Sequence, residues 1–349
     1  MSKKIKIGNL YIGGKERIAI QSMSTYKTSN IDKALQQALE VQNAGCDIFR
    51  YSVLDSEDAK SFKQLKSKLK MPLVADIHFD YKLALQSIDG GADKIRINPG
   101  NIGGENQIKE VAKALKNNNI PVRVGSNTGS IEKEFLAKYG KNEISLGESA
   151  LKNVAILEKY GIDNIVVSVK ASNVPLMIKA YQYIAEKTDY PLHLGVTEAG
   201  TEYNGIIKNA IGIGALLSQG IGDTIRVSLS ASTEKEVISA KAILSALDLR
   251  KGGVEVIACP TCGRCEWDCM SFANEVENYV KNINKPLKIA VMGCVVNGPG
   301  EAIDSDIGIA GAKEGYVIFV KGKTVRTIKK DSGVDFKAEF FGEIDKCIR

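Results

Sequence analysis

Short apolar runs alternate with longer amphipathic segments along the first 250 residues of the chain. Eight runs rich in Ile, Val and Leu have the composition of buried parallel strands. They lie at Ile18–Ser22, Asp47–Val53, Leu73–Ile77, Lys94–Asn98, Val122–Gly125, Asn164–Val169, Leu192–Val196 and Thr224–Ser228. Helix-like segments follow them at Ile31–Ala44, Ser56–Leu69, Tyr81–Asp89, Glu105–Lys116, Glu148–Tyr160, Asn173–Lys187, Gly205–Gln219 and Thr233–Leu247.

Eight strand–helix units in about 250 residues match a (β/α)8 TIM-type barrel. A doubly wound open sheet is the alternative, but it has fewer strands and usually a glycine-rich phosphate-binding motif after the first one, which this sequence lacks. We therefore predict an α/β fold in which residues 1–250 form the barrel.

The pattern changes near Gly252-Gly253, and residues 251–349 read as a separate small α+β domain. Its expected strands and helices are Val254–Ala258, Ser271–Val280, Leu287–Met292, Tyr316–Val320, Thr324–Ile328 and a final helix after Asp335. The sequence has no run of 18 apolar residues, so we expect no membrane span. It also has no apolar stretch after Met1, so we expect no signal peptide. We expect a cytoplasmic protein whose seven cysteines are thiols or metal ligands.

Composition excludes disorder, because 44% of residues are hydrophobic and 25% are charged. The net charge of +6 suits anionic substrates or acidic partners, but it is too diffuse to indicate nucleic acid binding.

Every predicted strand ends in polar residues, at the face where barrel enzymes carry their active sites. These residues are Gln21, Ser22, Arg50, Asp76, His78, Arg96, Asn98, Arg123, Asn127, Lys170, Thr197, Glu198, Arg226 and Ser228. Four arginines and one lysine at a single rim repel one another unless an anion lies between them, and guanidinium groups suit phosphate. The sequence thus predicts a polyanionic substrate, most simply a diphosphate.

Three ionisable groups of the rim have a second use. Asp76, His78 and Glu198 could bind substrate hydroxyls or transfer protons. Alternatively, Asp76 and His78 only orient one another. His193 lies within an apolar run and is expected to be structural.

A cysteine cluster marks the small domain, and three metal assignments fit it. Zinc would take four thiolates, whereas a ferredoxin-type cluster would use Cys259, Cys262, Cys265 and Cys269. The third assignment is a 4Fe–4S cluster on Cys259, Cys262 and Cys294, with the harder ligand Glu301 at the fourth iron. The remaining cysteines, Cys46 and Cys347, stand alone, and we expect no chemistry from them.

Motifs spread over nearly the whole chain resemble those of the 4-hydroxy-3-methylbut-2-enyl diphosphate synthase family, in its short bacterial form, from the methylerythritol phosphate route to isoprenoids. They are Val74-Ala-Asp-Ile-His78, Lys94-Ile-Arg-Ile-Asn-Pro-Gly-Asn-Ile-Gly103, Val122-Arg-Val-Gly-Ser-Asn127, Leu194-Gly-Val-Thr-Glu-Ala-Gly200, Cys259-Pro-Thr-Cys262-Gly-Arg264 and Gly293-Cys-Val-Val-Asn-Gly-Pro-Gly-Glu301. The last two are the most specific.

The resemblance implies an iron–sulfur oxidoreductase that reduces 2-C-methyl-D-erythritol 2,4-cyclodiphosphate to the linear allylic diphosphate with loss of water. The implied ligands of the single 4Fe–4S cluster are Cys259, Cys262, Cys294 and Glu301. Substrate contacts are implied for Arg50, Arg96, Arg123, Asn127, Lys170, Arg226 and Ser228, and reaction-pocket roles for Asp76, His78, Thr197 and Glu198.

The resemblance also implies partners. The electron donor would be ferredoxin or flavodoxin, and the cluster domain of one subunit would close over the barrel of the other in a homodimer. Cys265 and Cys269 stand outside the family pattern, and we expect neither to bind iron.

Two other functions remain as alternatives. One is a barrel methyltransferase that uses a pterin or corrinoid cofactor, since such barrels also end their strands with Asp, Asn and Arg. The other is a non-catalytic electron-transfer or zinc-binding module, which would have no use for a rim of five cations.

Overall fold

The computed structural model describes residues 1–349 except 251–252, 282, 284 and 296–303. Glu301, expected to be a cluster ligand, therefore lies outside the described residues. The chain divides into two compact units, Met1–Arg250 and Lys251–Arg349. Among the described helices, none is long and apolar enough to cross a membrane.

Eight parallel strands form the sheet of the first unit, in the order β8-β7-β6-β5-β4-β3-β10-β9. Val167 on β8 bridges to Leu192 just before β9, and its N–H donates to the Pro191 carbonyl at 2.9 Å, which closes the ring. The strands are β3 (Ala19–Met23), β4 (Ile48–Ser52), β5 (Leu73–Asp76), β6 (Lys94–Arg96), β7 (Val122–Asn127), β8 (Ile165–Lys170), β9 (His193–Leu194) and β10 (Thr224–Ile225). The predicted (β/α)8 barrel is confirmed.

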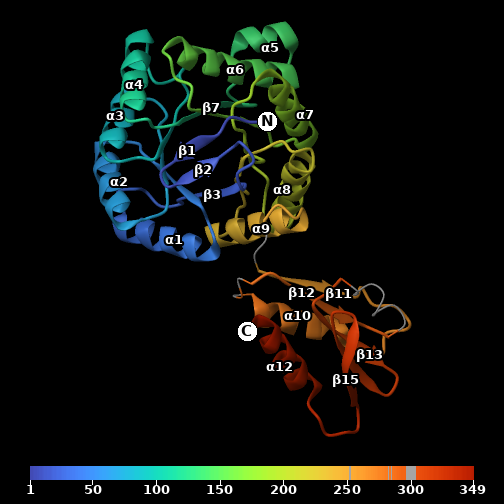
Figure 1. The fold of residues 1–349 in the computed structure, drawn as a ribbon. Coiled ribbons are helices and arrows are strands. Elements are labelled where there is room, and N and C mark those ends of the chain that lie inside the picture. Colours follow the sequence, from blue (N-terminus) through green and yellow to red (C-terminus); the bar gives the residue numbers. More distant parts are fainter. Residues whose placement is uncertain (251–252, 282, 284, 296–303) are drawn as a thin grey trace. The chain divides into compact units, whose positions relative to one another are not determined.

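Helices surround the strands on the outside of the ring (Figure 1). They are α1 (Ile31–Ala44), α2 (Ser56–Lys68), α3 (Tyr81–Asp89), α4 (Glu105–Asn117), α5 (Lys133–Tyr139), α6 (Glu143–Lys159), α7 (Val174–Lys187), α8 (Glu202–Leu217) and α9 (Thr233–Ala246). Side chains cap their N-termini: Asn30 accepts from Lys33 N–H, and Asp55 from Asp58 N–H. The C-cap of α1 is Gly45 at φ 102°, a backbone conformation that favours glycine.

An N-terminal hairpin, β1 (Ile5–Ile7) and β2 (Leu10–Ile12), lies at the amino ends of the barrel strands. Its buried isoleucines pack against Ala19, Ile48, Val74 and Val166, which lie at or beside the first residues of their strands. The hairpin therefore covers the end of the barrel opposite the polar strand ends. The sequence analysis predicted neither this hairpin nor α5.

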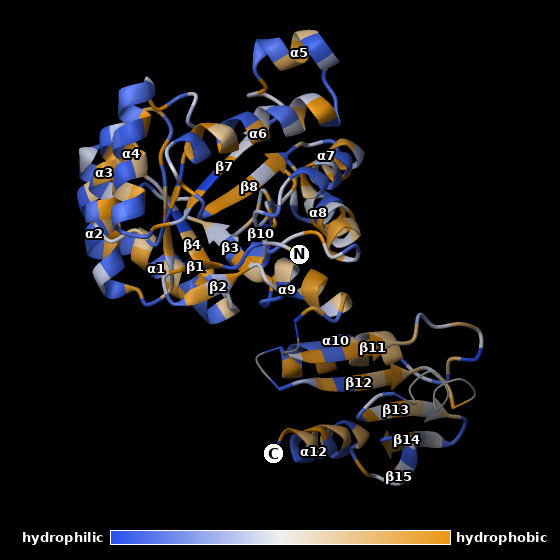
Figure 2. Cartoon of the chain, turned by 45° about the horizontal axis from the view of Figure 1, so that its top comes forward, coloured by the Kyte–Doolittle hydropathy of each residue, from blue (hydrophilic) through white to orange (hydrophobic). Residues whose placement is uncertain are grey.

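The second unit has a five-stranded sheet in the order β11-β12-β13-β14-β15. The first three strands are parallel, and the last two pair antiparallel. The elements are β11 (Val254–Ala258), α10 (Cys269–Val280), β12 (Leu287–Met292), β13 (Ile307–Ala312), β14 (Gly315–Val320), β15 (Lys323–Lys329) and α12 (Phe336–Ile348). Apolar faces of both helices lie against the sheet (Figure 2), with Phe272 and Phe340 fully buried between them.

The strand β13 was missed because its sequence, Ile-Gly-Ile-Ala-Gly-Ala, reads as a loop. Close packing against aromatic rings requires the two glycines of this strand. A Cβ on Gly308 would lie 2.3 Å from the Phe319 ring, and one on Gly311 would lie 2.2 Å from the Trp267 ring. Glycine is thus needed for close packing, a property that strand propensity does not report.

Candidate active site

Six cationic side chains gather at the strand ends and in the interior of the barrel. Arg50, Lys94, Arg123 and Lys170 are buried, and Arg96 and Arg226 are half-buried. They come from strands β4, β6, β7 and β8 and from the residue after β10. The charges of Arg50, Arg96 and Arg226 all act on Lys170, so they share one region of the fold. The structure thus brings together the predicted cations, and it adds Lys94.

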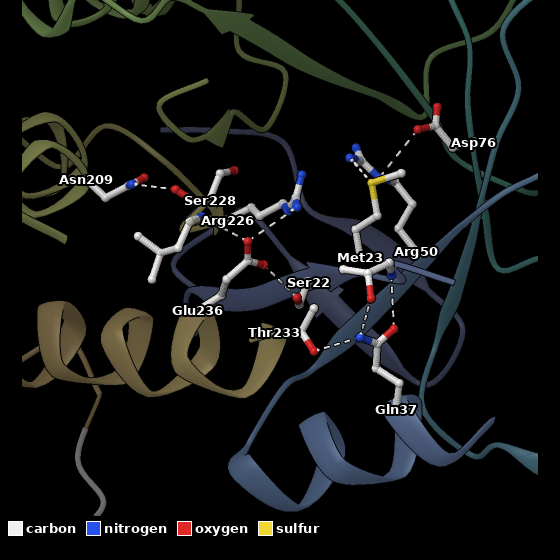
Figure 3. A network of polar contacts seen from close by, with 12 residues as sticks. Ser22, Met23, Gln37, Arg50, Asp76, Asn209, Arg226, Ser228, Thr233 and Glu236 are labelled. Atoms are coloured by element: carbon white, nitrogen blue, oxygen red, sulfur yellow. Dashed lines mark hydrogen bonds and ion pairs between the residues drawn. The ribbon is translucent and has the colours of Figure 1, made fainter. Parts of the chain in front are cut away.

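Asp76, at the end of β5, is a buried carboxylate among these cations. Its oxygens lie 3.1 Å from Arg96 Nη1 and 3.5 Å from Arg50 Nε (Figure 3 shows the second pair). Burial alone would raise the pKa of Asp76, but Arg50, Arg96 and Arg123 lower it to about 2. Asp76 is therefore ionised and cannot act as a proton donor near neutral pH.

His78 follows β5 and is half-buried. Arg96 Nη1 donates to His78 Nε2 at 2.9 Å, which leaves the imidazole proton on Nδ1. Burial lowers the pKa of His78, so the ring is neutral at pH 7. Asp76 and His78 thus contact the same Arg96 nitrogen, and His78 keeps an N–H group for a further acceptor.

Glu236 is a further buried carboxylate, and the sequence analysis missed it. It lies in the first turn of α9 and accepts hydrogen bonds from Ser22 Oγ at 2.9 Å and from Leu229 N–H at 3.0 Å. Its other contact is Arg226 Nη2 at 3.5 Å (Figure 3). Glu236 therefore ties the end of β3 to the loop that carries Arg226 and Ser228.

Several cationic nitrogen atoms have no strong acceptor within the described ranges of the chain. Arg123 Nε and Nη1 and Arg226 Nε are buried without a hydrogen-bond partner among the described residues. The Arg50 guanidinium faces the Met23 sulfur, a weak acceptor, at 2.7 and 3.2 Å. Burial and the charges of Arg50 and Arg96 lower the pKa of Arg123. Buried donors without acceptors are costly, so this arrangement favours a bound anion.

Lys94 is fully buried in the barrel interior. Its Nζ donates to Gln21 Oε1 at 3.2 Å, and Gln21 Nε2 is itself buried without a partner in the described part of the chain. Burial and the charges of Arg123 and Arg50 lower the pKa of Lys94. The sequence analysis looked for cations at the carboxyl ends of strands, whereas Lys94 is the first residue of β6 and was therefore missed.

The remaining rim residues lie at or beyond the strand ends: Asn127 is the last residue of β7, and Asn98, Thr197, Glu198 and Ser228 follow their strands. Asn127 and Glu198 are exposed, and Thr197 and Ser228 are half-buried. Glu198 has φ 54°, an uncommon backbone conformation for a residue with a side chain, and such strain is often found at functional positions. The Ser228 carbonyl accepts from the buried Asn209 amide at 3.2 Å, which fixes that loop.

Replacing Glu236 with Ala should lower the free energy of unfolding by about 2–4 kcal/mol, because it leaves the buried Ser22 hydroxyl, the half-buried Leu229 N–H and the half-buried Arg226 charge without their acceptor. Urea unfolding followed by circular dichroism measures the change. The matched control is Glu202→Ala, whose half-exposed ion pair with Lys235 contributes about 1 kcal/mol or less. Equal effects of both variants would contradict the role given to Glu236.

His193 makes the stability of the barrel pH-dependent. The ring is fully buried, its Nδ1 lies 2.8 Å from Thr224 Oγ1, and Nε2 lacks a partner among the described residues. Burial and neighbouring cations, first Arg123, hold its pKa well below 6.5. Below about pH 6.5, His193 is protonated in the unfolded chain but stays neutral in the folded chain. The free energy of unfolding is therefore highest above about pH 6.5 and decreases as the pH falls below that value.

Through His193, the free energy of unfolding should fall by about 2 kcal/mol when the pH is lowered from 7.5 to 5. Urea unfolding at a series of pH values measures the slope, and His193→Gln should flatten it. A variant with the slope of the unmodified protein would show that His193 is not the titrating group.

Thiols gather in the second unit where two neighbouring parallel strands end. Cys259 follows β11 directly, and Cys294 comes two residues after β12. The Cys259 N–H donates to the Val291 carbonyl at 2.9 Å, which places the two loops side by side. Between Cys259 and Cys262, Thr261 has φ 64°, an uncommon turn conformation. This packing brings the loops of Cys259 and Cys294 together, and Cys262 lies three residues after Cys259 in the first of them.

These thiols suit thiolate coordination of iron. All seven cysteines are free thiols. A hydrogen bond with the backbone of Arg264 lowers the pKa of the Cys262 thiol. Glycine at 293 keeps the space beside them open, since a Cβ there would lie 3.4 Å from Cys259 Sγ. Within the described residues, no group of three His, Cys, Asp or Glu side chains is set to hold a single metal ion.

Fold and site together define a barrel protein with buried cations at its strand ends and a second, thiol-bearing α+β unit. The chain belongs to the GcpE family: the GcpE TIM-barrel domain matches residues 2–241, and the GcpE protein C-terminal domain matches residues 255–345. The family expected from the sequence motifs is thereby confirmed.

Two curated relatives show how far the similarity extends. A protein of Caldanaerobacter subterraneus subsp. tengcongensis is 53% identical over 100% of this chain and 98% of its own length. A protein of Clostridium perfringens is 51% identical over 96% of each chain. Both are named 4-hydroxy-3-methylbut-2-en-1-yl diphosphate synthase (flavodoxin).

One solved structure is similar to this chain in the barrel fold. The dihydropteroate synthase of Yersinia pestis has a TM-score of 0.52 and 14% sequence identity, over 70% of this chain and 97% of that one. At this identity the similarity concerns the fold and not the reaction.

Proposed function

We propose that this protein catalyses the reductive ring opening and dehydroxylation of 2-C-methyl-D-erythritol 2,4-cyclodiphosphate to 4-hydroxy-3-methylbut-2-enyl diphosphate in isoprenoid biosynthesis. The reaction consumes two electrons and two protons and releases water. The observation that carries the proposal is a set of buried guanidinium nitrogens in the barrel that have no acceptor among the described residues, in a chain that also carries the cysteine loops. The family membership and the names of the two relatives support the same reaction.

In this proposal the cations of the barrel bind the diphosphate. Arg50, Arg96, Arg123, Lys170 and Arg226 would surround its oxygens, with Asn127 and Ser228 at the edge. The buried nitrogens of Arg123 and Arg226, which have no partner in the part of the chain that the structure describes, would gain phosphate oxygens as acceptors. Fixing the diphosphate in this way positions the carbon end of the substrate for reduction.

The residues Cys259, Cys262 and Cys294 would hold one 4Fe–4S cluster, with Glu301 as the weaker fourth ligand. When bound, such a cluster supplies electrons one at a time. Thiolate sulfur from three cysteines satisfies three irons, and a carboxylate is the more easily displaced ligand for the fourth.

The polar residues beside the cations would handle protons and hydroxyls. Asp76, ionised, and His78, with its proton on Nδ1, would bind the substrate hydroxyl groups. Thr197 and Glu198 follow β9, and the exposed Glu198 carboxyl would donate the proton that leaves with the hydroxyl as water.

Reduced flavodoxin, named for both relatives, is the proposed electron donor, with ferredoxin as the alternative. Both are acidic proteins and would suit a partner of net charge +6. We propose a cytoplasmic location, where seven thiols stay reduced. We also propose a homodimer in which the cluster domain of one subunit closes over the barrel of the other and excludes water.

Anaerobic reconstitution with iron and sulfide, followed by an assay on the cyclodiphosphate, tests the proposal. The loaded protein should form the linear diphosphate with a strong one-electron reductant and with reduced flavodoxin. Loaded protein that leaves the cyclodiphosphate unchanged with every reductant would contradict the proposed function. Conversion with reduced ferredoxin but not flavodoxin would contradict only the choice of donor.

A further inference from the structure

Two cysteines beside the cluster loops have no part in the proposed reaction. Cys265 Sγ lies 3.6 Å from Cys269 Sγ, and the Cys265 thiol also donates to the Trp267 carbonyl at 3.0 Å. Cys265 is half-buried, and Cys269 is buried at the first residue of α10. Cys265 is therefore the more accessible residue of the pair.

The backbone between these two cysteines is held in place by Trp267. Its ring packs 5.3 Å from Phe272 and 5.2 Å from Tyr316, and its Nε1 donates to the Met292 carbonyl at 3.0 Å. On the other side, Asp268 caps α10 by accepting from Ser271 N–H. Because this segment is fixed in the folded chain, the two sulfurs stay close without further loss of chain entropy.

We propose that Cys265 and Cys269 form a reversible dithiol–disulfide site, separate from the three thiols assigned to the cluster. A disulfide requires a sulfur–sulfur bond of about 2.05 Å, so the two sulfurs, 3.6 Å apart, have to approach each other by about 1.5 Å. The oxidant is a small-molecule disulfide such as oxidised glutathione.

The reaction takes two exchange steps. The Cys265 thiolate attacks one sulfur of the small disulfide, forms a mixed disulfide and releases one small thiol. The Cys269 sulfur then attacks the Cys265 sulfur, and its proton leaves with the second small thiol. The protein pair loses two electrons and two protons, and one small disulfide gains them as two thiols.

This pair lies against both loops that carry the proposed cluster ligands. The Cys265 N–H donates to the Cys262 carbonyl at 2.9 Å, and the Glu266 N–H donates to the Gly293 carbonyl at 3.0 Å. A Cβ on Gly293 would lie 2.9 Å from Cys265 Sγ. The pair is thus in contact with the ligand loops, yet its oxidation uses none of the sulfurs of Cys259, Cys262 or Cys294.

Peptide mapping of the full-length protein separates this pair from the other thiols. Trypsin cleaves after Arg264 and Lys281, so peptide 265–281 contains Cys265 and Cys269 as its only cysteines. Peptides 252–264 and 289–313 carry the proposed cluster ligands. The protein, purified anaerobically with and without its cluster, is treated with oxidised glutathione, alkylated and digested.

We expect peptide 265–281 to be unalkylated and lighter by two hydrogens in both preparations, and dithiothreitol should restore two alkylated thiols. Cys269→Ser should trap glutathione on Cys265, whereas the control Cys347→Ser should leave the internal disulfide unchanged. Full alkylation of peptide 265–281 after treatment, or a disulfide joining it to peptide 252–264 or 289–313, would overturn the proposal. Mapping of the unmodified chain decides the matter even if a variant fails to fold, and its outcome is independent of turnover.

Discussion

Replacing Cys294 with Ser should remove iron and turnover together. Serine oxygen is a harder and more weakly binding ligand than thiolate sulfur, so one corner of the cluster loses its anchor. Cys294 is buried beside the end of β12, where water cannot readily replace the lost ligand. We expect an activity loss of at least about a hundredfold, with iron and sulfide contents and visible absorbance falling in parallel.

The matched control for this prediction is Cys347→Ser, which removes a thiol from α12 in the same unit. It should keep the iron, the colour and the activity of the unmodified protein. A Cys294→Ser protein with a full complement of iron would contradict the ligand set and return the four cysteines 259, 262, 265 and 269 to consideration.

Replacing Arg123 with Met should raise the KM for the cyclodiphosphate by about a hundredfold or more, because a buried charged hydrogen-bonding partner of the substrate is lost. The same change should raise the melting temperature of the ligand-free protein. Arg123 Nε and Nη1 are buried without acceptors among the described residues, and an apolar side chain of similar volume relieves that cost. Steady-state kinetics and thermal unfolding measure the two effects, while the iron content should not change.

Arg17→Met is the control for a charge outside the barrel mouth, since Arg17 is half-exposed and pairs with Asp47. It should leave KM unchanged and shift stability by about 1 kcal/mol or less. An Arg123→Met protein with ordinary KM would show that the diphosphate does not bind among the barrel cations.

Regular alternation of buried strands and amphipathic helices made the barrel predictable. Helices such as α1 and α3 begin and end where the sequence indicated, because caps and stop signals lie in the same few residues. The rim cations were predictable for a related reason. Barrel topology places every strand end at one face, so Arg50, Arg123 and Lys170 come together without any knowledge of side-chain contacts.

Contacts between distant elements were not predictable in this way. Glu236 reads as one of several acidic residues at a helix start, and only the packing of α9 against β3 brings its carboxylate to Ser22. Lys94 reads as the polar beginning of a strand, but barrel closure buries it beside Gln21. The spacing of Cys265 and Cys269 fits a ferredoxin motif, whereas the fold turns the two sulfurs toward each other.

A crystal structure of the reconstituted protein with the cyclodiphosphate tests the central claim most directly. The account predicts iron bonded to three protein sulfur atoms, from Cys259, Cys262 and Cys294, and phosphate oxygens in contact with Arg50, Arg123 and Lys170. Four cysteine sulfurs on the cluster, with Cys265 or Cys269 among them, or a diphosphate bound away from the barrel cations, would contradict it.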